Sequence, residues 1–436
     1  MSNYIGIRHE NKYTTERRVP LSPKHIDYLI HNQKLDFVIQ RSSKRIFKDQ
    51  EYEVTGAELS DNLNKCDVIF GVKEIPVENL EAEKTYIFFS HVIKGQPHNL
   101  SMLKRLIELK CNLIDYEKIV DDQGKRIIFF GKYAGLAGMI TTLWALGKRL
   151  EYNGIKTPFL NLRQAHDYKT LKEARDAISE AGQQIAEQGL PAEISPLTIG
   201  ITGYGNVASG VLEILRLLPM KEISPEELLL LKNREKLPTN LMYKVIFKAE
   251  HISEHNDRLS DFDMDEYYAN PLNYHNVFEQ YVPHLSVLMN CMYWDKRFPR
   301  IITLDFLKQH WAKNNSQRLA VIGDISCDLD GSIECTYKGT EPDNPVYVYN
   351  PLNGEYSDGF EGEGILDMAI DILPSQLPRD ASEEFGEKLV KFVKPIAFAD
   401  FSQSFEDLEL PRPIKKGLIL HKGEFTPEFK YLEQYL

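Results

Sequence analysis

The sequence predicts an α/β protein built from two units, each with a largely parallel β-sheet. Over the first 130 residues, short apolar runs alternate with helical patterns, which is the arrangement of βαβ units. A second series begins at Leu197, where an apolar run leads into a glycine-rich turn. The length of 436 residues is enough for two or three domains of ordinary size.

In the first unit, five apolar runs have the character of buried strands: Tyr4–Ile7, Asp67–Lys73, Tyr86–His91, Asn112–Asp115 and Arg126–Phe130. Apolar residues recur at spacings of three and four in Pro23–Ile30 and Pro97–Lys110, which indicates helices. Gly131–Leu150 is a long apolar helix rich in Gly and Ala. Because small residues let another backbone approach closely, we place this helix between the two units.

The second unit has its own predicted strands: Leu197–Thr202, Lys221–Ile223, Ser286–Met292 and Leu319–Ile325. The stretch Asn233–Asn273 is polar and irregular, and its pattern orders no elements. The C-terminal segment is short and loop-rich, so we expect it to return to the first unit. We therefore expect a discontinuous first domain of residues 1–135 and 345–436, and a second domain of residues 136–344.

Composition excludes several classes of protein. Lys and Arg number 52 against 64 Asp and Glu, for a net charge of −12, and no basic block indicates a nucleic-acid partner. No apolar run approaches the roughly 18 residues of a membrane span, and the N-terminus lacks a signal-peptide core. The five cysteines form no CxxC pair, which favours a reducing, cytoplasmic setting. Cys327 and Cys335 lack histidines at ligand spacing, so we expect no metal.

The strongest local motif is the glycine loop after Leu197–Thr202. Gly203, Gly205 and Ala208 form a GxGxxA pattern, and a helix is predicted over Val207–Leu218. The first glycine permits the tight turn, the second lets a pyrophosphate approach the backbone, and the helix N-terminus offers free N–H groups. A glycine turn that binds nothing is the alternative, but a strand before and a helix after favour dinucleotide binding.

The sequence only hints at which dinucleotide binds. A carboxylate at the end of the second strand would bind the adenosine ribose and favour NAD. Here Lys221–Ile223 ends at Ser224, a hydroxyl, which leans towards NADP. Glu222 lies close enough to reverse this argument if the strand ends two residues earlier.

Charged side chains follow several strands of the first unit: Arg18, Lys73, Glu74, His91 and Glu117. Each has a duller explanation when taken singly, such as an Arg18–Glu16 pair or a structural histidine. Their recurrence at neighbouring strand ends favours a functional site, because sites form at the carboxyl ends of parallel strands.

These residues lie in motifs of a known family. IGIRHENKYTTERRVPLSP, GVKEIP, YIFFSHVIKGQ, GYGNVASG, VIGDISCDLDGSIE and DILPSQLPRDAS occur in the family's order. Over about Tyr4–Leu436, the chain resembles the lysine–2-oxoglutarate reductase module of the aminoadipic semialdehyde synthases of animals and plants. It is more distantly similar to fungal lysine-forming saccharopine dehydrogenase and to alanine dehydrogenase.

The resemblance implies two Rossmann-like domains with an active-site cleft between them, the discontinuous one being like the N-terminal domain of alanine dehydrogenase. It implies condensation of lysine with 2-oxoglutarate and reduction of the imine by NADPH, with NADH possible, to saccharopine. Lys73 and His91 match the acid–base pair, and Arg18 matches a residue that holds a substrate carboxylate. Glu74 and Glu117 match carboxylates that tune that pair, and Asp324 matches a residue beside the nicotinamide. Gly203, Gly205 and Asn206 match the pyrophosphate loop, in which Tyr204 and Val207 are also expected to contact the cofactor. Relatives commonly have a small residue in place of Tyr204.

Three alternatives remain open. The chain could be the NAD-linked, lysine-forming enzyme, or an opine or alanine dehydrogenase-like enzyme with another amine or keto acid. It could also be a binding module that no longer catalyses, since fold does not determine function. A separate glutamate-forming saccharopine dehydrogenase is a possible partner, and the sequence does not indicate an oligomeric state.

Overall fold

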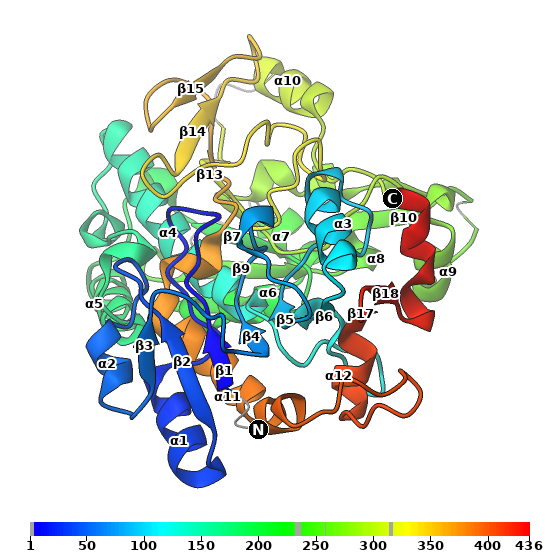
Figure 1. The fold of residues 1–436 in the computed structure, drawn as a ribbon. Helices are drawn as coiled ribbons and strands as arrows, with labels where there is room; N and C mark the ends of the chain where they lie inside the picture. The colour runs from blue at the N-terminus through cyan, green and yellow to red at the C-terminus, as the bar shows by residue number, and fades with distance from the viewer. Residues whose placement is uncertain (1–3, 232–236, 258, 314–316) are drawn as a thin grey trace. The chain divides into compact units, whose positions relative to one another are not determined.

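The computed structural model describes residues 4–231, 237–257, 259–313 and 317–436. The chain divides into two compact units, whose elements are labelled in Figure 1. Unit 1 comprises Met1–Phe130 and Pro378–Leu436, and unit 2 comprises Gly131–Leu377.

Unit 1 contains an eight-stranded sheet in the order β18-β17-β6-β5-β4-β1-β2-β3. Its parallel strands are β1 (Tyr4–Ile7), β2 (Asp36–Gln40), β3 (Glu58–Ser60), β4 (Val68–Phe70), β5 (Thr85–Phe88) and β6 (Asn112–Asp115). The strands β17 (Leu418–His421) and β18 (Glu424–Phe425) extend it antiparallel beyond β6. The order of the parallel strands is that of a doubly wound fold, so the sheet's carboxyl edge is where a ligand site is expected.

The helices of unit 1 are α1 (Pro23–Gln33), α2 (Asp49–Glu53), α3 (Leu100–Glu108), α11 (Pro378–Ala397) and α12 (Arg412–Gly417). Helix α1 starts at a proline, which suits a first helical position, and ends where Lys34 turns left-handed at φ 56°. It packs against α11: a Cβ on Gly386 would lie 2.3 Å from His25 Nδ1. The C-terminal segment thus contributes to the core of unit 1.

Unit 2 contains a second eight-stranded sheet, in the order β15-β14-β16-β13-β12-β7-β9-β8. Its parallel strands are β7 (Thr198–Thr202), β8 (Met220–Glu222), β9 (Met242–Phe247), β12 (Val287–Asn290), β13 (Val321–Asp324) and β16 (Ile365–Met368). The strands β14 (Val346–Tyr349) and β15 (Tyr356–Asp358) are antiparallel. A separate antiparallel pair is formed by β10 (Ser253–His255) and β11 (Tyr274–Asn276).

The helices of unit 2 are α4 (Gly131–Tyr152), α5 (Leu171–Gln188), α6 (Asn206–Leu215), α7 (Pro225–Leu230), α8 (Ala249–Ile252), α9 (Met264–Ala269) and α10 (Leu304–Lys313). Helices α4 and α6 cross at backbone distance. A Cβ on Gly135 would lie 1.9 Å from the Val207 carbonyl oxygen, and a Cβ on Gly210 would lie 2.2 Å from that of Lys132. The small residues of α4 therefore serve packing inside unit 2, to which the whole helix belongs.

Two expectations about organisation need correction. The division after Leu377 lies far beyond the expected boundary at 344/345, because β16 pairs with β13 and β14 pairs with β16 in the sheet of unit 2. Arg126–Phe130 is not a strand. Its apolar residues are covered by side chains instead: the Phe130 ring stacks on Phe385, with ring centroids 4.4 Å apart.

The stretch Asn233–Asn273 is more ordered than its pattern indicates. It contains β9, α8, β10 and α9, whereas residues 233–236 and 258 lie outside the described residues. The sequence pattern does not indicate strand β9, because only part of the strand alternates between buried and partly buried residues. Both of its neighbours in the sheet are parallel strands, and such strands lack a regular apolar–polar alternation.

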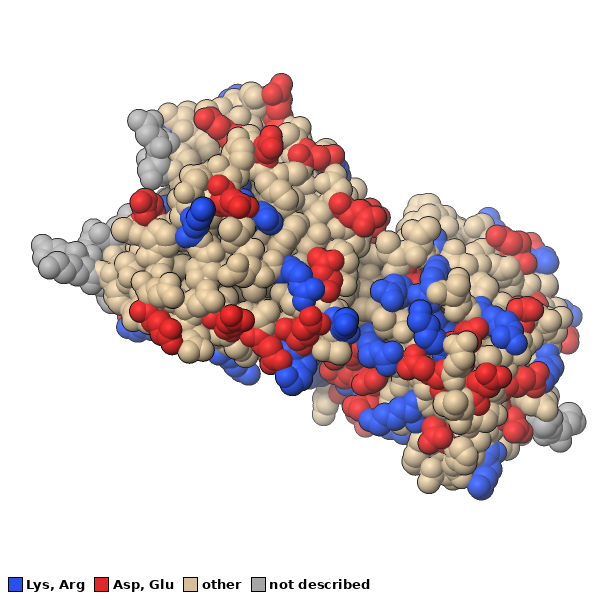
Figure 2. Space-filling model, turned by 90° about the vertical axis from the view of Figure 1, so that its left-hand side faces the viewer, with Lys and Arg blue, Asp and Glu red and all other residues tan. Residues whose placement is uncertain are grey.

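On the face drawn in Figure 2, Lys and Arg side chains lie interspersed with Asp and Glu. Among the described residues, no helix has the length and apolar character that crossing a membrane requires.

Candidate functional site

In unit 1, the charged strand ends meet along one edge of the sheet. Strands β1, β4, β5 and β6 are neighbours and parallel, so the loops after them lie side by side. These loops carry the predicted residues Arg18, Lys73, Glu74, His91 and Glu117. The sheet order thus places at one edge the groups that the sequence motifs single out.

Glu74 and His91 form the central pair of this edge. His91 Nδ1 lies 2.8 Å from Glu74 Oε1, and the same oxygen accepts Lys12 Nζ at 3.0 Å and Asn99 Nδ2 at 3.2 Å. Burial would raise the pKa of Glu74, but the bonds from His91 and Lys12 outweigh it and lower that pKa to about 2. A carboxylate accepts only, so His91 presents its Nδ1–H to Glu74 and keeps Nε2 for proton exchange.

The backbone at His91 is also specialised. His91 has φ 48°, a left-handed conformation rare for a residue with a side chain. Its ring stacks on Phe89, with centroids 6.1 Å apart and planes 14° from parallel. Since the Glu74 bond and the Phe89 ring act together, the imidazole is held in one orientation, as a proton-transfer group requires.

Lys73 is positioned through its backbone by Glu10. The carboxylate of Glu10 accepts the N–H groups of Val72 at 2.8 Å and of Lys73 at 2.9 Å. Glu10 is fully buried, which raises its pKa despite the nearby Arg8 guanidinium, 3.7 Å from Oε2. The Lys73 ammonium lies 5.6 Å from the centre of the Tyr13 ring. Its charge also helps to lower the pKa of Glu16, which places it near the next pair.

Arg18 forms an ion pair with Glu16, which is the structural role that the sequence suggests as the alternative to substrate binding. Arg18 Nε and Nη2 donate to the two oxygens of Glu16 at 2.8 and 2.6 Å. The guanidinium carbon lies 4.2 Å from the centre of the Phe130 ring. Burial opposes ionisation of Glu16, but Arg18 lowers its pKa below the ordinary value. One edge of the guanidinium is thus committed, and any substrate carboxylate would have to meet Nη1 and the outer side of Nη2.

Glu117 lies beside this group but does not join it directly. Its carboxylate pairs with Arg126, and its N–H donates to Asp115 Oδ1 at 2.7 Å. Asp115, at the end of β6, also accepts the hydroxyl and the N–H of Ser90, the residue before His91. Burial raises the pKa of Asp115. The connection from Glu117 to His91 therefore runs through Asp115 and Ser90.

In unit 2, the glycine loop has the predicted geometry. It joins β7 to α6, and Gly203 has φ 84°, which favours glycine. A Cβ on Gly205 would meet no atom within 4 Å, so open space lies against this backbone. Tyr204, Gly205 and Asn206 are exposed, and no side chain caps the N-terminus of α6. Together with Val207 in the first turn, these residues fit a dinucleotide pyrophosphate.

The prediction that Ser224 lies beside the dinucleotide is wrong, because β8, the strand that ends just before Ser224, is not next to β7. The neighbours of β7 are β12 on one side and β9 on the other, and β8 lies at the sheet edge beyond β9. Ser224 is the N-cap of α7, where its hydroxyl accepts the Glu227 N–H at 3.1 Å. The position next to the glycine loop belongs to Lys248, which follows Phe247, the register partner of Thr202.

Asp324 ends β13, in register with Asn290 of β12. It is 2% exposed. Its Oδ1 accepts Asn290 Nδ2 at 2.9 Å and the Cys327 N–H at 3.0 Å, and its Oδ2 accepts Thr336 Oγ1 at 2.8 Å. Burial raises the pKa of Asp324. The structure thus places this aspartate in a buried hydrogen-bond chain at the carboxyl edge of the sheet that carries the glycine loop.

The sequence does not predict four residues that contact the unit 1 site: Glu10, Lys12, Asn99 and Asp115. Glu10 and Lys12 lie in the motif IGIRHENK, but nothing in that motif indicates that they reach residues 62 positions onward. Asp115 lies at the end of a predicted strand, and this position is the one sequence feature that could have indicated a site residue among the four. Among the described residues, no cluster of three His, Cys, Asp or Glu side chains could hold a metal ion.

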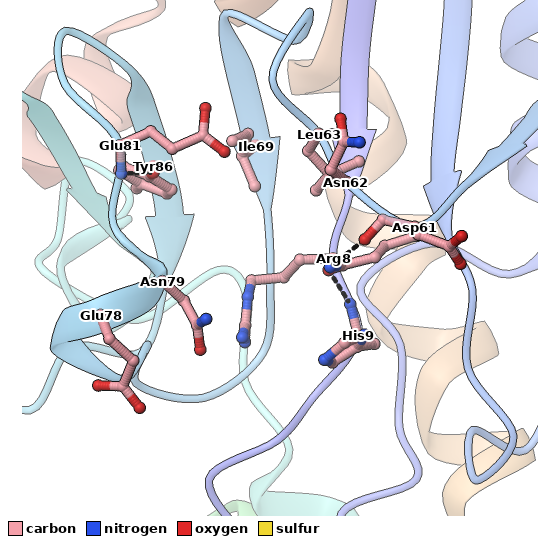
Figure 3. A pocket seen from close by; sticks show the side chains of 11 residues that line it. Arg8, His9, Asp61, Asn62, Leu63, Ile69, Glu78, Asn79, Glu81 and Tyr86 are labelled. Carbon is pink, nitrogen blue, oxygen red and sulfur yellow. Dashed lines mark hydrogen bonds between the residues drawn. The ribbon is translucent and has the colours of Figure 1, made fainter.

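A cavity of about 270 Å³ lies elsewhere on unit 1, and its lining includes neither Lys73 nor His91. Figure 3 shows the Arg8 side chain crossing it, with the guanidinium directed towards Asn79. Glu78, Glu81 and Asp61 also line the cavity. Arg8 is only 6% exposed. Its guanidinium is therefore the buried counter-charge of Glu10 and forms a wall of the cavity.

The chain is similar to known proteins over most of its length. Residues 6–137 match the alanine dehydrogenase/PNT N-terminal domain. The chain is 39% identical over 445 residues to alpha-aminoadipic semialdehyde synthase of Arabidopsis thaliana, covering 98% of this chain and 41% of that protein. It is 25% identical to the saccharopine dehydrogenase (NAD(+), L-lysine-forming) of Emericella nidulans, covering 89% of this chain and 91% of that one.

Among solved structures, an L-alanine dehydrogenase shares the fold, with a TM-score of 0.61 at 16% identity over 99% of both chains. The chain spans less than half the length of the plant synthase. In sequence it is similar to the aminoadipic semialdehyde synthases and to the lysine-forming saccharopine dehydrogenases, and it has a fold of two Rossmann-like domains, with an alanine dehydrogenase/PNT N-terminal domain match over residues 6–137.

Proposed function

We propose that this chain is an NADPH-dependent oxidoreductase that condenses L-lysine with 2-oxoglutarate and reduces the imine to saccharopine. The observation that carries this proposal is the Glu74–His91 pair, 2.8 Å apart, beside Lys73 at the carboxyl edge of a doubly wound sheet. The homology to aminoadipic semialdehyde synthases supports the choice of substrates.

The reaction needs two proton-exchanging groups. The lysine ε-amine must be neutral when it attacks the keto carbon, and the carbinolamine hydroxyl must gain a proton to leave as water. Histidine side chains in general exchange protons near neutral pH, whereas a lysine side chain is ordinarily protonated there and can remove a proton only in its neutral form. We assign proton delivery at the leaving hydroxyl to His91 Nε2 and proton removal from the amine to Lys73. Bound NADPH would supply the hydride to the imine carbon.

Arg18 is proposed to hold a carboxylate of 2-oxoglutarate with the guanidinium edge that Glu16 leaves open. Arg18→Lys loses the planar fork, so KM for 2-oxoglutarate should rise more than KM for lysine. The matched control is Arg17→Lys, since Arg17 is exposed on the same loop. An equal rise in both KM values would contradict this role.

NADPH is preferred over NADH in this proposal because of Lys248. It follows β9, the strand beside β7, where NAD-binding folds place a carboxylate for the adenosine ribose and NADP-binding folds place a cation. Lys248→Asp should therefore shift the ratio of kcat/KM values towards NADH. An unchanged ratio would show that another residue reads the ribose.

The first test is an assay of NADPH oxidation, followed by nicotinamide absorbance, with lysine and 2-oxoglutarate. Parallel reactions use NADH, and use pyruvate with ammonia in place of the two substrates. Turnover that requires NADPH, lysine and 2-oxoglutarate together would support the proposal. Faster turnover with NADH would favour the NAD-linked alternative that the Emericella nidulans relative represents. No turnover with any pair would contradict it.

We further propose that the protein acts in the cytoplasm and that a separate glutamate-forming saccharopine dehydrogenase consumes its product. The thiols support the first point, since all five cysteines are free. Subcellular fractionation tests it, and capture in another compartment would contradict it.

A further inference from the structure

A chain of side-chain hydrogen bonds runs across the carboxyl edge of the unit 2 sheet. It starts at Thr202, the residue before the glycine loop, whose hydroxyl donates to Asn290 Oδ1 at 2.8 Å. Asn290 Nδ2 donates to Asp324 Oδ1 at 2.9 Å. These three residues are register partners on β7, β12 and β13. The chain therefore crosses three neighbouring strands and links the glycine loop to Asp324.

Beyond Asp324, the series of hydrogen bonds continues through oxygen atoms only. Thr336 Oγ1 lies 2.8 Å from Asp324 Oδ2 and 2.8 Å from Asp367 Oδ2, and Tyr347 Oη lies 2.8 Å from the same Asp367 oxygen. All four residues are buried, none more than 2% exposed.

These three oxygen–oxygen contacts need three hydrogens. The hydroxyls of Thr336 and Tyr347 supply one each, and ionised carboxylates supply none. A third hydrogen must therefore lie on one of the two aspartates, because an unbridged contact of this length between buried acceptors would be strongly repulsive.

The donors around each carboxyl group decide where that proton lies. Asp324 accepts from Asn290, from the Cys327 N–H and from Thr336, so both of its oxygens are satisfied as an anion. Asp367 meets hydroxyls at Oδ2 only, and its Oδ1 is buried without a partner. A buried anion with one unsolvated oxygen costs more than one with three donors. The proton belongs on Asp367.

We propose that Asp367 is a positioning residue that holds the shared proton as a neutral carboxylic acid below neutral pH and, through Thr336, keeps Asp324 ionised at the carboxyl end of β13. The bonds then run in one direction: Tyr347 donates to Asp367, Asp367 to Thr336, and Thr336 to Asp324. For its consequence in catalysis the inference rests on the proposed function, in which Asp324 lies beside the nicotinamide.

The electrostatics of the cluster support this direction. Burial, and then the charge of Asp324, raise the pKa of Asp367 to about 7. The other titratable groups that act on Asp367 or respond to it are Tyr347, Tyr356, Cys327 and Cys335. Burial raises the pKa of each, so all four keep their hydrogens at neutral pH. The two aspartates alone share the titration.

The first experiment measures stability against pH and requires no substrate. A group whose pKa is raised by folding contributes stability at low pH and loses it as pH rises through the folded pKa. The free energy of unfolding should thus fall as pH rises from 3.8, the ordinary pKa of an aspartate, to about 7, and should level off above that pH. Asp367→Asn cannot ionise and can donate its amide N–H to Thr336, while the Tyr347 hydroxyl can turn to the Cys335 carbonyl oxygen, 3.4 Å away. This fall should therefore disappear, and stability at the acid end of the range should stay close to that of wild type. The control Asp343→Asn changes an exposed carboxyl and should leave the fall in place.

The opposite pattern would overturn the proposal. If Asp324→Asn preserves stability and removes the fall, whereas Asp367→Asn destabilises at every pH, the proton lies on Asp324. Should Asp367→Asn fail to fold, Tyr347→Phe is the second variant. It removes a donor to Asp367, so the midpoint of the fall should move to higher pH, and an unmoved midpoint would contradict the assignment.

The second experiment separates this inference from the proposed function. With lysine and 2-oxoglutarate, Asp367→Asn should retain kcat within about threefold of wild type below neutral pH and extend the active range on the alkaline side. Loss of kcat at all pH values would contradict a positioning role through Asp324. If wild type shows no lysine-dependent turnover but the stability pattern holds, the proposed function fails and the assignment of the proton stands.

Discussion

Glu74 shows how one buried carboxylate organises a site. A single oxygen of Glu74 lies within hydrogen-bond distance of Lys12, His91 and Asn99, while its other oxygen is buried without a partner. This concentration of donors stabilises the anion strongly. It also explains why neither His91 nor Glu74 can be understood from its own strand end alone.

Glu74 should make stability dependent on pH in the acid range. Its pKa is about 2 in the folded protein against an ordinary 4.5. A lowered carboxyl pKa contributes stability above the unfolded value and loses it as pH falls towards the folded value. The free energy of unfolding should therefore fall on acidification from about pH 4.5 to 2, on the order of 3 kcal/mol for this group. Glu74→Gln should lose this component in acid unfolding curves, whereas Glu78→Gln, an exposed neighbour, should keep it.

Lys73 and His91 should be required for turnover and dispensable for cofactor binding. Removal of a positioned proton-transfer group costs about 10²–10⁴ in rate, so Lys73→Met and His91→Gln should each lower kcat by that factor. NADPH affinity, measured by fluorescence titration, should stay nearly unchanged, because the glycine loop belongs to the other unit. Lys104→Met and His98→Gln are matched controls on exposed residues of unit 1. Unchanged kcat in both active-site variants would refute the assignment.

Among the elements, the β7–loop–α6 segment owes its position to α4. The backbones of α4 and α6 touch at Gly135 and Gly210, and this contact holds the N-terminus of α6 beside the end of β7. The apolar, glycine-rich character of α4 was readable from the sequence, but which helix it would meet was not.

Gly135→Ala should destabilise unit 2. A Cβ there would lie 1.9 Å from the Val207 carbonyl oxygen, so backbone must move. Overpacking of this kind costs about 1–3 kcal/mol, more than the gain of at most about 1 kcal/mol from replacing a helical glycine by alanine. Chemical denaturation measures the net loss. Gly339→Ala is the control, because its Cβ would have 3.8 Å to its nearest neighbour. Equal stability of the two variants would contradict tight α4–α6 packing.

At the scale of the whole molecule, the two units have separate sheets. Unit 1 carries Lys73 and His91, the proposed proton-transfer pair, and unit 2 carries the glycine loop. Ligands of different kinds should therefore protect different parts of the chain.

NADPH should slow amide hydrogen exchange chiefly in β7 and the first turn of α6. A ligand at about 100 times its Kd stabilises the folded state that binds it by about 2.7 kcal/mol, and the local contacts should concentrate protection near Gly203–Val207. Lysine with 2-oxoglutarate should instead protect the loops after β4 and β5. Exchange measured by mass spectrometry on the full chain distinguishes the two patterns. Protection of the β4 and β5 loops by NADPH alone, with none at the glycine loop, would contradict this division.

The sequence by itself determined what local chemistry encodes. A strand, a GxGxxA turn and a helix follow one another within Leu197–Leu215, so this unit was predictable from neighbouring residues. Lys73, Glu74 and His91 were predictable as charged strand ends for the same reason, because each apolar run ends where these charged or titratable residues follow it.

The tertiary structure decided which strands and side chains are neighbours. The placement of β9 beside β7, which puts Lys248 and not Ser224 next to the glycine loop, depends on sheet pairing between segments distant in sequence. The membership of β14 and β16 in unit 2 has the same origin. So do the bonds of Glu10 to Lys73 and of Asp367 to Asp324 through Thr336. Hydrogen bonding and burial set these contacts only after the chain has folded, and no local pattern specifies them.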